Sequence, residues 1–425
     1  MFDKIEINKG LLEFIESSPV SYQTVDTITK RLKNAGFCDI CDSDFNESVK
    51  GRCAKIYSIR AGSSLIAMKF PENSEIRPKG FHMVCAHTDS PMFKIKENAE
   101  HTDANGYCKL NTEKYGGMIV NTWLDRPLSV AGRVVFENDG ELNTRNVDLK
   151  QPLYIIPNVA IHMIRGLDEK PLSIQTDLQP IGGEGLYEML AKEAGCKDVS
   201  DILGTDLYLY NAQNGCILGS GSRFVCAPRL DDLQCVYTAL EGFLAADSDD
   251  YINVFGVFDN EEVGSLSRQG AASDFLKRIL DMTSEALDLS AQEYAQMLDK
   301  SFMVSADNAH AVHPNHPEKA DIVNRPKLNG GVVIKYHGGQ RYTTDAYSGA
   351  FIKQICKNNR IPYQIYHNNS DIAGGSTLGN LIQANVSVKA ADIGVAQLAM
   401  HSSYETAGTE DTLNMYKFMK LFYSI

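Results

Sequence analysis

Imidazole and carboxylate side chains recur where apolar stretches of this sequence end. They occur in VCAHTDSPMF, APRLDDLQ, VFDNEEVGS, VSADNAHAVH and QLAMHSSYE, which contain His87 and Asp89, Asp231 and Asp232, Glu261 and Glu262, Asp307 and His310, and His401. Such ligands suit zinc, manganese or cobalt, whereas a thiolate site would need clustered cysteines. The pattern therefore indicates metal chemistry.

Two histidines and three carboxylates are enough to hold a pair of divalent ions. The candidate ligands are His87, Asp231, Glu262, Asp307 and His401. One carboxylate has to bridge the two ions, and we assign this to Asp231, although spacing alone does not decide it. Glu261 is then free to act as general base, while the paired ions polarise a carbonyl and generate a bridging hydroxide.

Asp89 has a predicted role beside His87. A metal-bound histidine usually donates its other ring N–H to a carboxylate, which fixes its tautomer and direction. Each group taken alone also has an ordinary explanation: a polar strand end, a solvated acidic pair, or a helix N-cap for Asp231 and Asp232. Their shared position at strand ends and at a helix start favours a metallohydrolase.

The elements around these residues alternate between strands and helices. We expect a helix up to Gly36, a hairpin in KIYSIRAGSSLIAMKF, strands in FHMVCA and INVFGVF, and a closing amphipathic helix. A further helix should bury Leu233, Val236, Leu240 and Phe243 on one face. Near-continuous apolar strands predict an α/β sheet covered by helices on both faces, with ligands beyond the carboxyl ends of its strands.

The middle of the chain has a different pattern of apolar and polar residues. From residue 92 to residue 219, short alternating runs such as LSVAGRVVFEN, LYIIP and LSIQTDL are separated by Gly, Asn and Asp, and one helix-like stretch, EGLYEMLAKEAG, interrupts them. We predict a β-rich dimerisation domain over 92–219, inserted into a catalytic domain formed by 1–91 and 220–425.

The composition of the chain argues against some classes of binding partner. The net charge of −13 argues against nucleic acid or an anionic membrane as the main partner. No apolar run has the length of a membrane span, and the charged start MFDKIEINKG lacks a signal-peptide core, so we expect a cytoplasmic protein. Ten cysteines are scattered along the chain, and the lone pair Cys38 and Cys41 has no second pair that would complete a zinc site.

Eight blocks resemble one known family, in order and over nearly the whole chain. They are AHTDSP, YGGMIVNTWLDRPLSVAGRV, IPNVAIHM, RLDDL, FDNEEVGS, SADNAHAVHPN, VIKYHGGQRY and QLAMHSSYE. This order resembles the aspartyl aminopeptidase family of dinuclear zinc exopeptidases. Asp232, where animal members carry Asn, and SDIAGGSTLG are similar to bacterial members.

The resemblance implies roles for individual residues. It implies the five metal ligands named above with Asp231 bridging, Glu261 as general base, and His162, His310, Lys335 and Tyr342 as substrate contacts. The equivalent of His162 lies in the inserted domain and reaches a neighbouring subunit's active site. The family also implies dimers that assemble into a dodecameric shell. From the sequence alone, His162 would more simply be a buried histidine in an apolar strand.

We therefore expect a metalloaminopeptidase that removes the N-terminal residue of peptides and prefers acidic ones. Lys335 is the candidate cation for that side chain, because a charge-assisted hydrogen bond is about twice as strong as a neutral one. Two alternatives stay open: a deacylase or carboxypeptidase on the same scaffold, and a catalytically silent assembly or cargo protein.

Overall fold

A nine-stranded sheet forms the centre of the larger part of the molecule. The computed structural model describes residues 2–40, 54–71, 77–164 and 171–425. The sheet runs in the order β1 (Cys38–Asp39), β2 (Lys55–Arg60), β3 (Ser64–Lys69), β14 (Tyr251–Phe258), β4 (Gly80–His87), β15 (Phe302–Ala306), β19 (Lys389–Gly394), β17 (Val332–Lys335) and β18 (Tyr363–Tyr366). Strands β14, β4, β15 and β19 are parallel, so their carboxyl ends share one edge.

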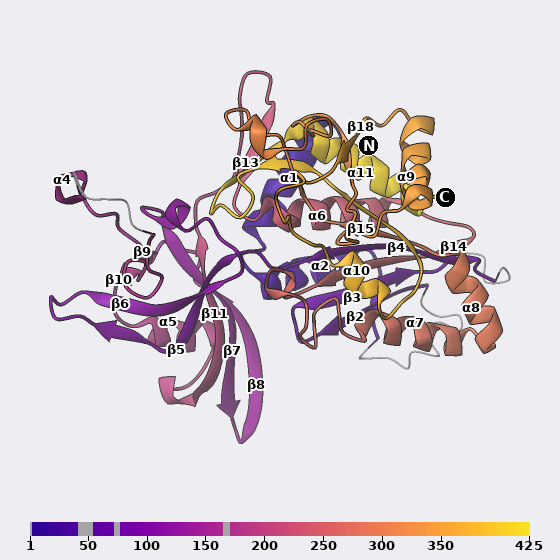
Figure 1. Cartoon of the computed structure of the whole chain (residues 1–425). Helices are drawn as coiled ribbons and strands as arrows, with labels where there is room; N and C mark the ends of the chain where they lie inside the picture. Colours follow the sequence, from indigo (N-terminus) through magenta and orange to yellow (C-terminus); the bar gives the residue numbers. More distant parts are fainter. Residues whose placement is uncertain (1, 41–53, 72–76, 165–170) are drawn as a thin grey trace.

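Helices cover both faces of this sheet (Figure 1), which confirms the predicted α/β class. One face carries α1 (Lys4–Glu16), α2 (Ser21–Asn34), α6 (Leu230–Ala245), α9 (Ala346–Asn358) and α11 (Thr409–Tyr423). The other face carries α7 (Phe275–Ala286), α8 (Ala291–Lys300) and α10 (Gly379–Gln383). Strand β4 serves both layers because side chains alternate along a strand: Val84 and Ala86 join the first, Met83 and Cys85 the second.

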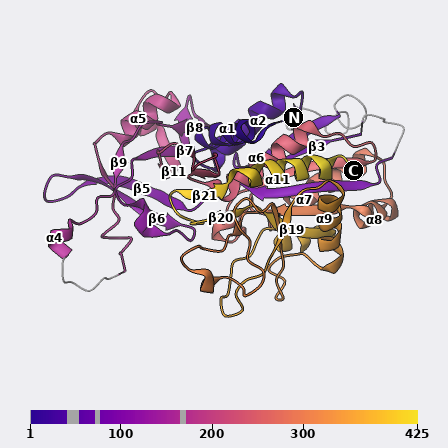
Figure 2. The ribbon, with the colours of Figure 1, turned by 90° about the horizontal axis from the view of Figure 1, so that it is seen from above.

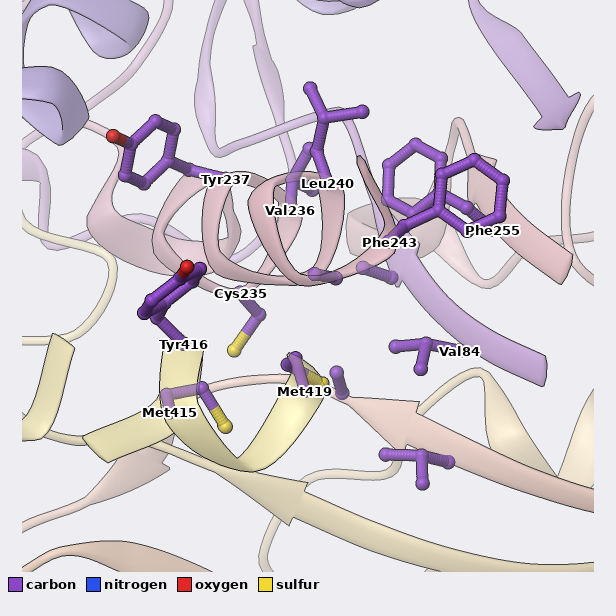
Figure 3. Packing of buried hydrophobic residues seen from close by; sticks show 14 of the residues in the cluster. Val84, Cys235, Val236, Tyr237, Leu240, Phe243, Phe255, Met415, Tyr416 and Met419 are labelled. Atoms are coloured by element: carbon purple, nitrogen blue, oxygen red, sulfur yellow. The ribbon is translucent and has the colours of Figure 1, made fainter. Parts of the chain in front are cut away.

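The packing of α6 between α11 and the sheet holds the helix that starts at the candidate site. Val236, Leu240 and Phe243 are fully buried, as the periodicity predicts, and Figure 3 shows them with Met419 of α11. Burying such a side chain contributes about 1.5–3 kcal/mol. Gly242 allows the close approach, because an added Cβ would lie 2.6 Å from the Cβ of Met419.

The inserted part closes on itself. Its strands run in the order β11 (Ile202–Asn211), β5 (Met92–Thr102), β6 (Cys108–Tyr115), β10 (Ile181–Gly182), β9 (Tyr154–Ile155), β7 (Leu128–Asn138) and β8 (Glu141–Asp148). Because β11 also pairs with β7, six strands form a closed ring around a separate apolar core. This part stands beside the α/β body, and its short helix α4 (Ile161–Ile164) lies at the outer end (Figures 1 and 2).

Several boundaries differ from the predictions. LSIQTDL forms a turn instead of a strand, because Asp177 both donates from its backbone to Ser173 O and accepts from Ser173 N. The first helix is two helices, α1 and α2, with Pro19 between them.

Residues 212–219 do not join the ring of the insert. Strand β12 (Cys216–Leu218) belongs to a third sheet, with β13 (Phe224–Ala227), β21 (Glu405–Gly408), β20 (Ala396–Leu398) and β16 (Ala309–His310). Cys38 is exposed at the start of β1, and Cys41 lies outside the described residues. Within the described ranges, no helix has the length and apolar character needed to cross a bilayer.

Candidate active site

Three neighbouring parallel strands bring the predicted ligands to one edge. His87 is the last residue of β4, opposite Phe258 at the end of β14, and the Glu261–Glu262 pair follows in the short 3₁₀ helix η4 (Glu261–Val263). Asp307 follows β15 on the other side of β4. The carboxyl ends of parallel strands are where α/β folds place their ligands.

Asp231 stands between the two histidines and shows a different oxygen to each. Its Oδ1 lies 3.5 Å from His87 Nε2, and its Oδ2 lies 3.4 Å from His401 Nε2. Asp307 Oδ1 is 3.9 Å from the same His87 nitrogen, and Glu262 Oε1 is 3.4 Å from the same His401 nitrogen. The five residues therefore form two half-sites that share one carboxylate.

These distances suit ligands of a common ion. Tetrahedral zinc with bonds of about 2.0–2.1 Å separates its ligand atoms by about 3.3 Å. The Asp231 Oδ1 atom is buried and accepts no hydrogen bond within the described part of the chain. A buried carboxylate oxygen without a partner is costly, and a cation there would remove that cost. The donor set and its spacing fit a pair of divalent ions.

Opposite charges dominate the electrostatics of the site. Burial opposes ionisation of Asp231, but the nearby imidazoles of His401 and His87 hold its pKa below the usual range. Burial alone would lower the pKa of His401, whereas the carboxylates of Asp231 and Glu262 raise it to about 10. The pKa of His87 is raised by the same kind of partners, Asp231 and Asp89, against the effect of burial.

Glu261 differs from its neighbour in environment. Burial raises the pKa of Glu261 to about 8, and it also raises the pKa of Glu262 and of Asp307. Glu261 is half-buried, and one of its oxygens lies in a cluster with His87 and Glu262 whose ligand atoms are all within 4.8 Å of one another. A carboxylate beside the ligands with a raised pKa suits proton transfer near neutral pH.

Asp232 joins the centre from a position that the ligand assignment left out. It is fully buried, and one of its oxygens falls within 4.8 Å of ligand atoms of His87, Asp231 and Asp307. Its Oδ2 accepts a hydrogen bond from the His87 backbone N–H at 3.3 Å. The carboxylate next to Asp231 thus holds the end of the strand that carries His87.

Asp89 lies beside His87, but its contact differs from the predicted one. The His87 Nδ1 atom hydrogen-bonds the backbone carbonyl of Asp89 at 3.0 Å, while the carboxylate is 3.5 Å away. A carbonyl only accepts, so Nδ1 carries the proton and Nε2 is left for a metal. The carboxylate instead accepts from the backbone N–H groups of Glu261 at 3.0 Å and Glu262 at 3.1 Å.

Glu405 is a buried site residue that the sequence analysis missed. Its carboxylate accepts from the Asp231 N–H at 3.0 Å and from the His401 N–H at 2.7 Å. Burial raises the pKa of Glu405 to about 8. The only sequence signal is an acid four places after His401, and its partner Asp231 is 174 positions away. His401 also hydrogen-bonds the carbonyl of Gly117, in the insert, through Nδ1 at 2.6 Å.

Three of the four predicted substrate contacts border this centre. Lys335 is buried, and its ammonium donates to the carbonyls of Asp307 at 2.7 Å and Asn308 at 3.1 Å, and lies 3.4 Å from Asp307 Oδ2. Tyr342 is buried with its ring 5.2 Å from that ammonium. Part of the His310 surface is exposed, but the protein packed around its ring lowers its pKa by desolvation, which the charge of Asp231 opposes.

His162 is not brought to its own chain's site. It lies in the four-residue helix α4, whose side chains are all exposed, at the outer end of the insert (Figure 2). The expectation of a buried histidine in an apolar strand is therefore wrong. The apolar pattern around His162 belongs to an exposed surface, where Ile161 is 65% and Met163 75% accessible.

A family model described as aminopeptidase I zinc metalloprotease (M18) matches residues 14–423. The chain belongs to the M18 aminopeptidase family. A protein of Clostridium novyi named "Probable M18 family aminopeptidase 2" is 41% identical over the full length of both chains. A relative of the same name from Pseudomonas aeruginosa is 36% identical over 99% of each.

Solved structures agree with this membership. The mApe1 structure of Chaetomium thermophilum has a TM-score of 0.88 at 28% identity and covers 99% of this chain and 98% of that one. The S. cerevisiae mApe1 dodecamer has a TM-score of 0.85 at 26% identity, with 98% and 96% covered. The predicted fold class and the predicted zinc aminopeptidase family are thereby confirmed.

Proposed function

We propose that this chain is a dinuclear metalloaminopeptidase that removes the N-terminal residue from peptides. The observation that carries the proposal is Asp231, whose two oxygens face two different histidines at 3.5 and 3.4 Å. A single ion would need only one of these two pairs of an Asp231 oxygen and a histidine nitrogen. His87 and Asp307 would hold one ion with Asp231, and His401 and Glu262 would hold the other.

Two such ions, when bound, polarise a peptide carbonyl and lower the pKa of water. The residues of the chain supply the rest. Glu261 accepts a proton from the attacking water and passes it to the leaving amine. Asp89 keeps Glu261 and Glu262 in place through their backbone N–H groups, and Glu405 does the same for Asp231 and His401.

Substrate recognition falls to His310 and Tyr342 in the same chain and to His162 of a neighbouring copy. The preference for an acidic N-terminal residue is part of the proposal and rests on the family resemblance. Lys335 supports it least, since three contacts with Asp307 and Asn308 already occupy its ammonium.

Assembly is proposed to complete the site. The exposed α4 lies far from its own centre, and the insert begins at Met92, directly after the His87 strand (Figure 1). We assign dimerisation to residues 92–219 and catalysis to 1–91 and 220–425. The S. cerevisiae structure is described as a dodecamer, which supports a closed shell for this chain as well.

A metal and substrate panel tests the proposal. Zinc-loaded protein should contain about two ions per chain and cleave peptides with a free amine, but not N-acylated amino acids. Glu261→Gln should keep its metal and lose kcat by about 10²–10⁴-fold, whereas Glu262→Gln should lose metal. Cleavage of N-acylated substrates alone would favour the deacylase, and no turnover with zinc, manganese or cobalt would favour the silent protein.

A further inference from the structure

The insert reaches the catalytic centre through three residues at the end of β6, which we call the 115–117 segment. Tyr115 is the last residue of β6, and Gly116 and Gly117 follow it. Tyr115 is 9% exposed, and its hydroxyl donates to Asp89 Oδ2 at 2.7 Å. The same hydroxyl accepts from the side-chain amide of Asn260 at 2.9 Å. Tyr115, a residue of the insert, is thus hydrogen-bonded to Asn260, directly before Glu261 in the chain, and to Asp89.

The two glycines make separate contacts with metal ligands. Gly116 has a φ of +75°, and an added Cβ would lie 3.0 Å from the Cβ of Glu262. Gly117 offers its carbonyl to His401 Nδ1 at 2.6 Å. The carbonyl of His401 in turn accepts from the Ile119 N–H at 2.9 Å. The segment is in contact with both ends of the half-site formed by Glu262 and His401.

Asp89 connects the Tyr115 hydroxyl to Glu261 and Glu262. This carboxylate is 3% exposed and accepts three hydrogen bonds: from Tyr115, from the Glu261 N–H and from the Glu262 N–H. Asn260 uses its amide on the Tyr115 oxygen, so the hydroxyl proton has Asp89 as its acceptor. Burial together with Asp89 and Asp259 raises the pKa of Tyr115, which keeps the hydroxyl protonated as a donor.

We propose that Tyr115 is a positioning residue for the general base, through which the insert sets the geometry of the Glu261–Glu262 pair. The proposal rests on the proposed function in one respect, the role of Glu261 as base. It gives the insert a second task besides assembly, because any change that moves the end of β6 moves the Asp89 carboxylate and with it both glutamates.

The test compares zinc-loaded Tyr115→Phe with Tyr294→Phe. The control removes a matched hydroxyl, which donates to Asp281 at 3.0 Å between α8 and α7, away from the site. For Tyr115→Phe we expect kcat to fall about 10–100-fold, the usual effect of losing a partner behind a catalytic group. We expect KM and zinc content to stay within twofold of wild type, and Tyr294→Phe to change neither kcat nor KM.

Amide hydrogen exchange supplies a readout that needs no turnover. In Tyr115→Phe, exchange at Glu261 and Glu262 should become about tenfold faster, while exchange along β14 stays unchanged. Unchanged exchange at the two glutamates, or equally faster exchange throughout β14 and the insert, would overturn the proposal. A wild-type protein that cleaves no peptide would contradict the proposed function, yet the exchange result would still decide the role of Tyr115.

A second variant covers the case in which Tyr115→Phe does not fold. Asn260→Gly tolerates the positive φ of 63° at this position and removes the amide that directs the Tyr115 hydroxyl. It should produce the same local increase in exchange at Glu261 and Glu262. If exchange there stays at the wild-type rate, Tyr115 does not position the pair.

Discussion

At the scale of single residues, two buried carboxylates outside the proposed ligand set decide where the ligands lie. Asp89 accepts the N–H groups of Glu261 and Glu262, and Glu405 accepts those of Asp231 and His401. Leaving a buried backbone N–H unpaired is costly, and these two side chains pair four of them. Each carboxylate therefore holds two reactive residues by their backbone and leaves their side chains free for a metal or a proton.

Lys335 plays a comparable part for Asp307. Replacing it with methionine keeps the bulk of the side chain and removes the ammonium that binds the Asp307 and Asn308 carbonyls. We expect Lys335→Met to weaken zinc binding about 10–100-fold and to lower kcat/KM equally for peptides that begin with Asp, Glu, Leu or Ala. Zinc titration and a four-peptide assay measure both effects.

Lys69→Met is the matched control for this prediction. Lys69 is also a buried lysine, and it binds the Ala246 carbonyl and lies 3.0 Å from Asp247, remote from the ligands. Its replacement should lower stability without changing zinc affinity. A loss confined to the Asp and Glu peptides in Lys335→Met would instead show that Lys335 reads the substrate side chain.

The histidine pKa values predict proton release on metal binding. His401 has a pKa raised to about 10, so in the metal-free protein it is protonated at neutral pH. Its ion pair stabilises that form fully below the unfolded value of about 6.5, and the contribution is lost as pH rises through about 10. Zinc requires a neutral nitrogen and must displace the proton.

Calorimetry in two buffers checks this release. At pH 7.5, zinc titrations in PIPES and in Tris should give different observed heats, because the two buffers differ in ionisation enthalpy. With His401 protonated beforehand, the difference should correspond to at least one proton per chain. Equal heats in the two buffers would mean that His401 is already neutral.

At the scale of elements, the 115–117 segment is one of the places where the insert contacts the catalytic part of the chain. Gly116→Ala should be damaging for two reasons: its φ of +75° disfavours a side chain, and the new Cβ would press on Glu262. We expect a stability loss of about 1–2 kcal/mol from the backbone, together with reduced zinc occupancy, measured by thermal unfolding and metal analysis.

Gly106→Ala separates these two effects. Gly106 has a φ of +84° in the β5–β6 turn, and an added Cβ would meet nothing within 4 Å. It should cost similar stability and leave zinc occupancy unchanged. If Gly116→Ala behaved in the same way as Gly106→Ala, contact with Glu262 would have no bearing on the metal centre.

The elements that the sequence predicts well are those with local signals. Alternating and continuous apolar runs predict β2, β3, β4 and β14. The polar residues just beyond them predict which side chains meet, since parallel strands end at one edge. The sequence does not identify Glu405 and Tyr115 as site residues, because their hydrogen bonds join positions far apart in the chain. Likewise, no local pattern shows that β11 turns to pair with β7 and closes the ring of the insert.

His162 shows a different limit. The apolar letters around it indicate burial, and they lie on an exposed four-residue helix instead. Apolarity reports that a surface is to be covered, but not whether the same chain covers it. Sequence patterns therefore misplace residues whose partners would come from another copy.

At the scale of the whole molecule, the separation of α4 from its own centre makes a prediction about mixed assemblies. Under the proposal, the site of one subunit needs its own Glu261 and the His162 of a neighbour. His162→Ala and Glu261→Gln should each be nearly inactive when expressed alone. Co-expression should restore activity, because the His162→Ala subunit keeps Glu261 and receives an intact His162 from its Glu261→Gln neighbour.

The expected recovery follows from random pairing. Half of the dimers are mixed, and one of the two sites in each is complete, which gives about a quarter of wild-type activity. Each variant expressed alone is the control, because its homodimers contain no complete site. Activity that stays at the level of the single variants would mean that His162 does not serve a neighbouring subunit, and a fully active His162→Ala protein would remove it from the reaction altogether.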